Sequence, residues 1–264
     1  MLVQNIGKMI SIRIKKVIDK VIDVSQSTFF LSNRGLLDRV LVVNKVVDEH
    51  KRKKRSGVIV KIDFEKAYDS VNWEFLYYMI GRLGLCGKWI QWIKVYLEYA
   101  TISVLVNDNP TKEFKPSRGL RQGDPIAPFL FLIMTQGLSG LVNQATRKIL
   151  FSGIKVVNKK LEVNLLQFAD DILFVYESSV QNIMTIKAML RCFELGYGLK
   201  VNFHKSKIGI VGVDRNLVKL YTEILYCNLM VFPFTYLGLP VGGNSSRCSF
   251  WEPVLSKIKK KFLV

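Results

Sequence analysis

LLQFADDILFV, residues 165–175, places two adjacent carboxylates, Asp170 and Asp171, between two apolar runs. The apolar runs are typical of strands, and the charged pair between them indicates a tight turn. Two like charges in an apolar hairpin repel each other and lose hydration, so a divalent cation is the natural compensation. A third carboxylate, Asp63, ends the apolar strand expected at residues 58–63. Carboxylates that converge from two strand ends predict an oxygen-ligand site for Mg²⁺.

The charge of the chain indicates a polyanionic partner. Its 264 residues include 39 Lys and Arg against 21 Asp and Glu, a formal net charge of +18. This balance favours nucleic acid over a membrane surface, and no apolar run has the length needed to cross a bilayer. Four widely spaced cysteines without a CxxC pair and two isolated histidines argue against a zinc finger or a disulfide framework. Together with a magnesium site, this composition indicates phosphoryl transfer on a nucleic acid.

The hydrophobic periodicity predicts helices and strands in an irregular order. We expect helices at residues 6–24, 36–50, 73–83, 89–99, 125–147, 180–195, 214–225 and 250–264. We expect strands at residues 58–63, 102–106, 153–157, 161–176, 201–211 and 234–241, with a turn at 158–160. The order lacks the steady β-α alternation of a doubly wound fold, so it predicts an α+β fold with a mostly antiparallel sheet.

Capping residues mark several of these helix ends. The candidate N-caps of the helix at 73–83 are Asp69, Ser70 and Asn72. Asp124, followed by Pro125, is the expected N-cap of the long apolar helix. Gly196 and Gly198 are expected to stop the helix that begins at residue 180.

Five sequence motifs resemble those of reverse transcriptases. KIDFEKAYDSV at 61–71 is similar to polymerase motif A, SRGLRQGDP at 117–125 to motif B, FADD at 168–171 to motif C, GLKVNFHKSK at 198–207 to motif D, and YLGLPVG at 236–242 to motif E. The likeness is to the reverse transcriptase domain of plant non-LTR (LINE-type) retrotransposons, and it covers residues 25–242 with the motifs in order.

This resemblance implies a right-hand polymerase fold, in which a palm with an antiparallel sheet flanked by helices carries helical fingers and a truncated thumb. The expected divisions are partial fingers at 1–57, palm with motif A at 58–80, a fingers/palm insertion at 81–116, palm with motifs B to E at 117–242, and the start of the thumb at 243–264. Relative to the family, we expect a missing fingers strand before Ile6, and neither an endonuclease domain nor a zinc knuckle.

The resemblance also assigns the carboxylates to catalysis. Asp63 and Asp170 would bridge two Mg²⁺ ions, for which Mn²⁺ is a possible substitute, and Asp171 would support one of them. The Phe64 carbonyl is a natural additional ligand. Such a pair of ions stabilises the attacking and leaving oxygens of an in-line displacement at phosphorus. The residues alone leave an alternative, in which Asp63 caps a helix and the other two lie in an exposed turn.

A second group of residues is implied to bind the incoming nucleotide. Tyr68 would underlie its sugar and collide with a 2′-hydroxyl, which predicts an enzyme that makes DNA. Gln122 would hydrogen-bond near the base or sugar, and Gly123 lets the backbone approach closely. Arg121 would meet the nucleotide and Arg118 the primer or template, although a solvent-facing or salt-bridged role for one of them is an equal alternative.

The last motifs supply a cation and a primer contact. Lys205 would neutralise the departing pyrophosphate or give it a proton, with Lys207 as the second candidate and an ordinary surface lysine as the alternative. Leu239, Pro240 and Gly242 lie in the hairpin that resembles the element holding the primer end. Plain turn chemistry is the other interpretation of this hairpin.

Two functions of different classes follow from the sequence. The first is an RNA-directed DNA polymerase whose partners are an RNA template, a DNA primer or target, and dNTPs, with no membrane partner. The second is a catalytically inactive, truncated remnant that binds nucleic acid through its charge. An RNA-dependent RNA polymerase fits less well, because Tyr68 and the Ala-Asp-Asp turn count against it. The expected setting is intracellular, in the nucleus or the cytoplasm, and the oligomeric state stays open.

Overall fold

The computed structural model describes residues 2–22, 36–156 and 161–262, so the turn expected at 158–160 lies outside the described residues. The helices are α1 (Leu2–Val21), α2 (Leu36–Lys53), α3 (Trp73–Arg82), α4 (Gly87–Glu98), α5 (Ala127–Arg147), α6 (Val180–Tyr197), α7 (Arg215–Leu225) and α8 (Cys248–Phe262). The strands are β1 (Gly57–Ile62), β2 (Leu105–Val106), β3 (Asn109–Pro110), β4 (Ile154–Val156), β5 (Leu161–Val163), β6 (Leu165–Phe168), β7 (Asp171–Glu177), β8 (Lys207–Val211), β9 (Asn228–Leu229), β10 (Phe234–Tyr236) and β11 (Leu239–Val241).

Five of these strands form one central sheet in the order β6-β7-β1-β8-β9. All neighbours are antiparallel except β8 and β9, which run parallel. Ile62 at the end of β1 pairs with Ile172 of β7, so β1 ends beside the β6–β7 turn. The mostly antiparallel sheet expected from the sequence is therefore confirmed, and its register brings the end of β1 to the Asp170–Asp171 turn.

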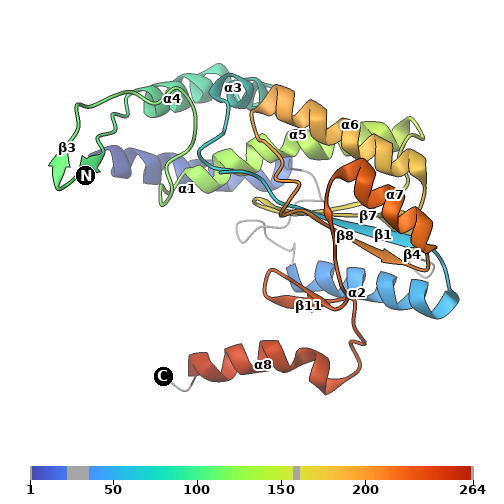
Figure 1. The fold of residues 1–264 in the computed structure, drawn as a ribbon. Helices are drawn as coiled ribbons and strands as arrows, with labels where there is room; N and C mark the ends of the chain where they lie inside the picture. Colours follow the sequence, from blue (N-terminus) through green and yellow to red (C-terminus); the bar gives the residue numbers. More distant parts are fainter. Residues whose placement is uncertain (1, 23–35, 157–160, 263–264) are drawn as a thin grey trace.

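The sheet separates two hydrophobic cores. In β1, Val58, Val60 and Ile62 belong to the core shared with α5 and α6, whereas Ile59 belongs to the core shared with α2. This division follows from the alternation of side chains along a strand. Figure 1 shows α5 and α6 on one side of the sheet, with α2 and β11 on the other. Helix α2, which was assigned to the fingers, therefore packs against strands that were assigned to the palm. The division into fingers, palm and thumb stays a prediction.

Helix ends follow the capping rules only in part. Asn72 is the N-cap of α3, and its side chain accepts a hydrogen bond from the Phe75 N–H at 3.0 Å, as expected. The expected N-cap at Asp124 is wrong: α5 begins at Ala127 after Ile126, and the Asp124 carboxylate binds Tyr96 Oη and the Ile126 N–H instead.

The stop expected at Gly196 is also wrong, because α6 continues to Tyr197, whose ring packs against Phe193 with centroids 4.0 Å apart. Gly198 does end α6, in a left-handed conformation with φ of 78°.

The strand expected at 201–211 forms only from residue 207 onward. Asn202 interrupts it, because its side-chain oxygen accepts a hydrogen bond from the Lys205 N–H and its carbonyl accepts one from the Ser206 N–H. The chain therefore turns between Asn202 and Lys205 before it enters β8.

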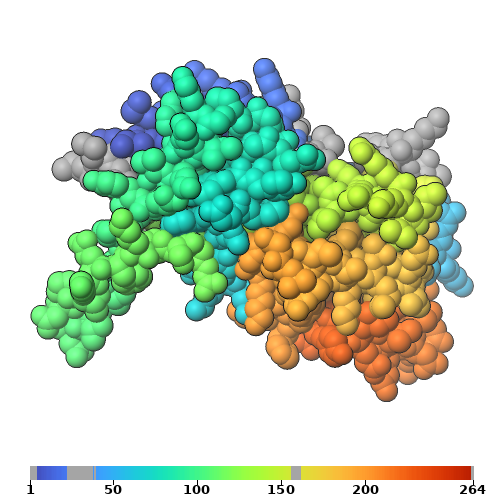
Figure 2. Space-filling model, turned by 90° about the horizontal axis from the view of Figure 1, so that it is seen from above, coloured from blue at the N-terminus to red at the C-terminus, as the bar shows by residue number. Residues whose placement is uncertain are grey.

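Two segments extend from the body of the molecule. The β2–β3 hairpin is exposed throughout and projects outward as the green arm of Figure 2. Helix α8 has no buried residue among those described, and Figure 1 shows it beyond β11 at the foot of the molecule. Of the described helices, none combines the length and the apolar character that a membrane crossing requires.

Candidate active site

The turn between β6 and β7 holds two of the three carboxylates that were predicted to bind metal. Phe168 and Asp171 form its closing pair, and only Ala169 and Asp170 lie between them. Ala169 adopts a left-handed conformation with φ of 51°, which a tight two-residue turn requires. The turn expected from the sequence is thus confirmed, and it places the two carboxylates at the edge of the central sheet.

Asp63 follows the last residue of β1, and hydrogen bonds fix its backbone on both sides. Its N–H donates to Ser206 Oγ at 3.1 Å, and its carbonyl accepts from the Asn202 N–H at 2.8 Å. Ser206 is fully buried, and its hydroxyl donates to the Asn202 carbonyl at 2.8 Å. Sequence reasoning missed both partners, which lie in the turn before β8 and hold Asp63 at the level of the β6–β7 turn.

The three carboxylates are electrostatic neighbours. The Asp170 side chain reaches the surface at the tip of the turn, yet the protein around it removes enough water to raise the pKa of its carboxyl. The negative charges of Asp171 and Asp63 raise this pKa further, and the Lys61 ammonium acts in the opposite direction. An environment that disfavours the ionised form in this way suits a site that receives a cation.

The donor chemistry fits a hard divalent cation, although the side chains do not form a closed cage. Within the described residues, no group of three or more His, Cys, Asp or Glu side chains is placed to hold a metal ion as it stands. Asp171 Oδ1 instead lies 3.3 Å from Lys61 Nζ. The Phe64 carbonyl accepts no hydrogen bond from the described chain and stays available beside Asp63. Three carboxylates and a free carbonyl are the oxygen donors that Mg²⁺ prefers.

Tyr68 lies within electrostatic range of this turn. Its ring stacks on Phe131 of α5, with centroids 4.6 Å apart and an angle of 11° between the planes. Burial raises the pKa of the Tyr68 hydroxyl, and the charge of Asp170 adds to the effect. The ring is therefore held flat against α5, close enough to Asp170 for the two side chains to interact electrostatically.

The loop before α5 is tied to the segment that carries Tyr68. The Leu120 N–H donates to the Tyr68 carbonyl and the Gly119 N–H to the Val71 carbonyl, both at 2.8 Å. Trp73 Nε1 donates to the Gly119 carbonyl at 2.7 Å. Gly119 has φ of +89°, and a Cβ there would lie 2.8 Å from a backbone oxygen of the neighbouring segment, so only glycine fits.

The remaining candidates of this loop gather around a cavity of about 430 Å³. Arg118, Arg121 and Gln122 all line it, and none of the three carboxylates does. The Arg121 guanidinium lies 5.6 Å from the centre of the Tyr96 ring. Gly123 has φ of +81°, and a Cβ built on it would meet no atom within 4 Å, so open space adjoins its backbone. The structure therefore brings three of the four predicted motif B residues, Arg118, Arg121 and Gln122, to one cavity, and Gly123 does not line it.

The β10–β11 hairpin is hydrogen-bonded both to the β6–β7 turn and to α2. Tyr236 Oη donates to the Asp171 carbonyl at 3.1 Å. The buried Asn44 of α2 donates to the Pro240 carbonyl at 3.0 Å, and its Oδ1 accepts from the Gly242 N–H at 2.7 Å. The predicted primer residues Leu239, Pro240 and Gly242 thus lie on a hairpin anchored beside Asp171. Neither anchor, Asn44 nor Tyr236, was singled out from the sequence.

A scan against protein-family models matches residues 1–248 to the reverse transcriptase (RNA-dependent DNA polymerase) family. The chain belongs to this family. By type, it is an RNA-directed DNA polymerase domain.

The curated relatives of this reverse transcriptase domain include proteins of non-LTR retrotransposons. It is 28% identical over 242 residues to the Pol polyprotein of the type-2 retrotransposable element R2DM of Drosophila melanogaster. That match covers 88% of this chain and 22% of the polyprotein, so the chain spans about a fifth of the relative's length. An uncharacterised mitochondrial protein of Arabidopsis thaliana is 46% identical over 67 residues, which are 25% of this chain and 55% of that protein.

Solved telomerase structures share the fold. Telomerase from Candida tropicalis, in complex with a fragment of telomeric RNA, superimposes with a TM-score of 0.59 at 16% identity, covering 89% of this chain and 35% of that one. Telomerase from Candida albicans gives the same TM-score at 13% identity over 98% of this chain and 41% of that one. The reverse transcriptase domain therefore has the α+β right-hand polymerase fold expected from the sequence.

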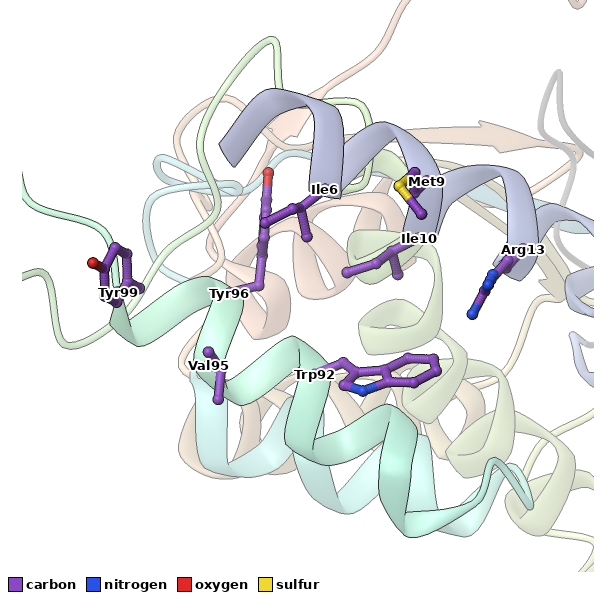
Figure 3. A pocket seen from close by; sticks show the side chains of 8 residues that line it. All are labelled: Ile6, Met9, Ile10, Arg13, Trp92, Val95, Tyr96 and Tyr99. Carbon is purple, nitrogen blue, oxygen red and sulfur yellow. The ribbon is translucent and has the colours of Figure 1, made fainter. Parts of the chain in front are cut away.

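The reverse transcriptase also has an apolar groove that holds none of the predicted site residues. It lies between α1 and α4 and has a volume of about 570 Å³. Figure 3 shows Ile6, Met9 and Ile10 of α1 facing Trp92 of α4, with Arg13 at one end. The Arg13 guanidinium lies 5.7 Å from the centre of the Trp92 ring. The groove therefore lies apart from the carboxylates and is not part of the candidate active site.

Proposed function

We propose that this domain polymerises DNA on an RNA template. The observation that carries the proposal is the tight turn of Asp170 and Asp171 beside the end of β1, where Asp63 is held by Ser206 and Asn202. In this proposal, the 3′-hydroxyl of a DNA primer attacks the α-phosphate of a dNTP and pyrophosphate leaves. The coupling of the three carboxylate charges supports their shared role.

Magnesium is the proposed cofactor, with Mn²⁺ as a substitute. Asp63, Asp170, Asp171 and the Phe64 carbonyl would hold two ions, which when bound supply Lewis-acid stabilisation of the attacking and leaving oxygens. The protein's part is to fix the ligands: Ser206 holds Asp63 on one side, and the closing pair of the β6–β7 turn fixes Asp171 on the other.

The other proposed roles follow from the placement of each side chain. The Tyr68 ring, stacked on α5, would underlie the sugar and exclude a 2′-hydroxyl by contact. The open space at Gly123 would admit the nucleotide, with Gln122 beside it. Arg121 and Arg118, on the rim of the same cavity, would contact phosphate or template.

Lys205 would place its ammonium near the departing pyrophosphate. It lines a cavity together with Asp63, and its N–H is fixed by the Asn202 side chain. Leu239, Pro240 and Gly242 would support the primer end, since their hairpin is hydrogen-bonded to the Asp171 carbonyl through Tyr236.

Primer extension is the deciding experiment. The purified chain is given Mg²⁺, dNTPs and a labelled DNA primer on an RNA template, beside the variants Asp170→Asn and Asp108→Asn. Asp108 lies in the exposed β2–β3 hairpin, so its variant controls for the loss of one carboxylate. We expect the parent and Asp108→Asn to extend the primer with dNTPs in preference to rNTPs, and Asp170→Asn to bind the substrate without extending it. Extension by Asp170→Asn would refute the assignment of the carboxylates.

One observation favours a second candidate, a nucleic-acid-binding domain without catalysis. Asp171 is engaged by Lys61, and the described carboxylates do not form a closed metal cage. With a net charge of +18, such a domain would bind nucleic acid in a salt-sensitive, sequence-independent way. Salt-sensitive binding of RNA by the parent and by Asp170→Asn, with extension by neither, would establish this alternative.

We further propose an origin in a plant LINE-type element, supported by the 46% identity to the Arabidopsis segment. The proposed setting is the nucleus or the cytoplasm, and imaging of a fluorescent fusion in plant cells would test it.

A further inference from the structure

Two lysines face each other across the strands that lead into the site. In the register of β1 and β8, Lys61 is directly opposite Lys207. Residues opposite each other in an antiparallel pair project from the same face, and like charges in that arrangement destabilise the sheet. A local conflict of this kind in an otherwise consistent fold is expected at functional sites.

The charges of these lysines are only partly neutralised. Lys61 Nζ lies 3.3 Å from Asp171 Oδ1, so it shares its charge with the catalytic turn. Lys207 is exposed, and no carboxylate of the described chain forms an ion pair with it. The face that carries Lys61 and Lys207 therefore retains a positive charge that the protein itself does not neutralise.

Both lysines line a cavity of about 470 Å³ between β1, β8 and the β10–β11 hairpin. Its cationic part is formed by Lys61, Lys205 and Lys207, and its one carboxylate is Asp63. Its other lining residues are the apolar Leu229, Met230, Val231 and Phe234, together with Thr235. The volume lies in the range of small-ligand sites. The lining combines three ammonium groups with four apolar side chains, which suits an anion that carries an apolar group.

The chemistry that matches this lining is a phosphate ester of a nucleotide. We propose that Lys61 and Lys207 bind a phosphodiester of the primer strand close to its 3′ end, with the sugar against the apolar side chains. The position follows from the cavity, which is lined both by the catalytic candidate Asp63 and by Phe234 of the β10–β11 hairpin. The inference rests on the proposed function, because it takes the bound strand to be the primer.

Binding measured without catalysis tests this subsite. A fluorescent DNA primer annealed to RNA is titrated with protein in EDTA at several salt concentrations, using Lys207→Gln, Lys207→Arg and the control Lys219→Gln. Lys219 is exposed on α7, where it pairs with Glu223 at 3.9 Å. One phosphate contact contributes about 0.9 to the slope of log K against log salt, which is about eightfold in affinity at 0.1 M salt.

We expect Lys207→Gln to weaken binding about eightfold and to reduce the salt slope by about one, as the loss of one contact predicts. Lys207→Arg should keep the slope, and Lys219→Gln should change neither quantity. Equal losses in Lys207→Gln and Lys219→Gln would overturn the proposal, because they would show only the effect of net charge. Lys61→Gln should act in the same direction as Lys207→Gln.

A second arm identifies the phosphate. Neutral methylphosphonates are placed one at a time at the last linkages of the primer. At the contacted linkage the parent should lose about eightfold in affinity, and Lys207→Gln, which keeps only the Lys61 contact, should lose less. The triphosphate of a dNTP has the same chemistry, so inorganic pyrophosphate is tested as a competitor. If Lys207→Gln changes only pyrophosphate competition and leaves duplex binding unchanged, the primer assignment is overturned. Because no step needs catalysis, a chain that fails to extend primers can still support or refute the subsite.

Discussion

Replacing Asn44 with alanine should weaken the attachment of the β10–β11 hairpin to α2 in the reverse transcriptase domain. Asn44 is 1% exposed on α2 and makes hydrogen bonds to two backbone groups of the hairpin, the Pro240 carbonyl and the Gly242 N–H. These partners lie 196 and 198 residues away in the chain. Alanine at this position leaves both backbone groups without the partner that the asparagine supplies.

The expected loss can be estimated from these two groups. A buried polar group that loses its partner costs about 1–3 kcal/mol, so two groups cost about 2–6 kcal/mol before relaxation. Lys51 Nζ still donates to the Gly242 carbonyl at 2.7 Å and keeps the hairpin close to α2, so a value of about 3 kcal/mol is expected. In a domain of this size, this corresponds to a fall in Tm of about 6–12 °C.

Urea unfolding followed by circular dichroism measures the change, with Lys45→Ala as the control. Lys45 is the next residue on α2 and is exposed, so its variant should stay within about 0.5 kcal/mol of the parent. In primer extension, Asn44→Ala should raise the KM for the primer and also lower kcat, because the hairpin is hydrogen-bonded through Tyr236 to the turn that carries Asp170 and Asp171. A stability loss below about 1 kcal/mol would show that Asn44 does not carry the hairpin.

Three further predictions concern Tyr68, Gly137 of α5 and Tyr197 of α6. Tyr68→Ala should lower the preference for dNTPs over rNTPs, measured as a ratio of kcat/KM values, and Tyr68→Phe should keep it, because the ring still stacks on α5. Gly137→Ala should lower the free energy of unfolding by about 1–3 kcal/mol in urea, because the added Cβ would lie 2.1 Å from Tyr197 Cε1. Gly140→Ala is the control and should not destabilise the domain, because a Cβ there would meet no atom within 4 Å. Burial raises the pKa of Tyr197 to about 12, so the hydroxyl ionises at a lower pH in the unfolded chain than in the folded one. The free energy of unfolding should therefore fall as the pH rises from about 10 to 12. Tyr197→Phe should lessen this fall, measured by unfolding at alkaline pH.

Local sequence patterns predicted most helices, strands and turns, because each of these depends mainly on the residues of its own segment. The apolar runs on both sides of Asp170 and Asp171 predicted a turn between two strands, and Asn72 caps α3 as its side chain allows. The same reasoning failed where a tertiary contact competed. Gly196 stays helical because aromatic packing extends α6 to Tyr197. The Asp124 carboxylate binds Tyr96 Oη as well as the Ile126 N–H, and α5 begins at Ala127, two residues later than expected.

The candidate site shows a similar division. Motif residues such as Asp63, Asp170 and Tyr68 could be named from the sequence, since their chemistry and order carry the resemblance. Their supports could not be named, because Ser206 and Asn44 look like ordinary polar residues until folding brings them to Asp63 and Gly242. Burial of a small polar side chain is visible only in the folded chain.

These supports connect the candidate site into one hydrogen-bonded assembly. Asn44 holds the hairpin at Gly242, Tyr236 of the same hairpin donates to the Asp171 carbonyl, and Lys61 pairs with the Asp171 side chain. A displacement of the hairpin therefore acts on the turn that carries two of the carboxylates. It follows that the proposed primer contacts and the proposed metal ligands are positioned by the same hydrogen bonds. A substitution in α2, on the sheet face opposite α5, should consequently affect primer binding and catalysis together, although α2 carries none of the catalytic motifs.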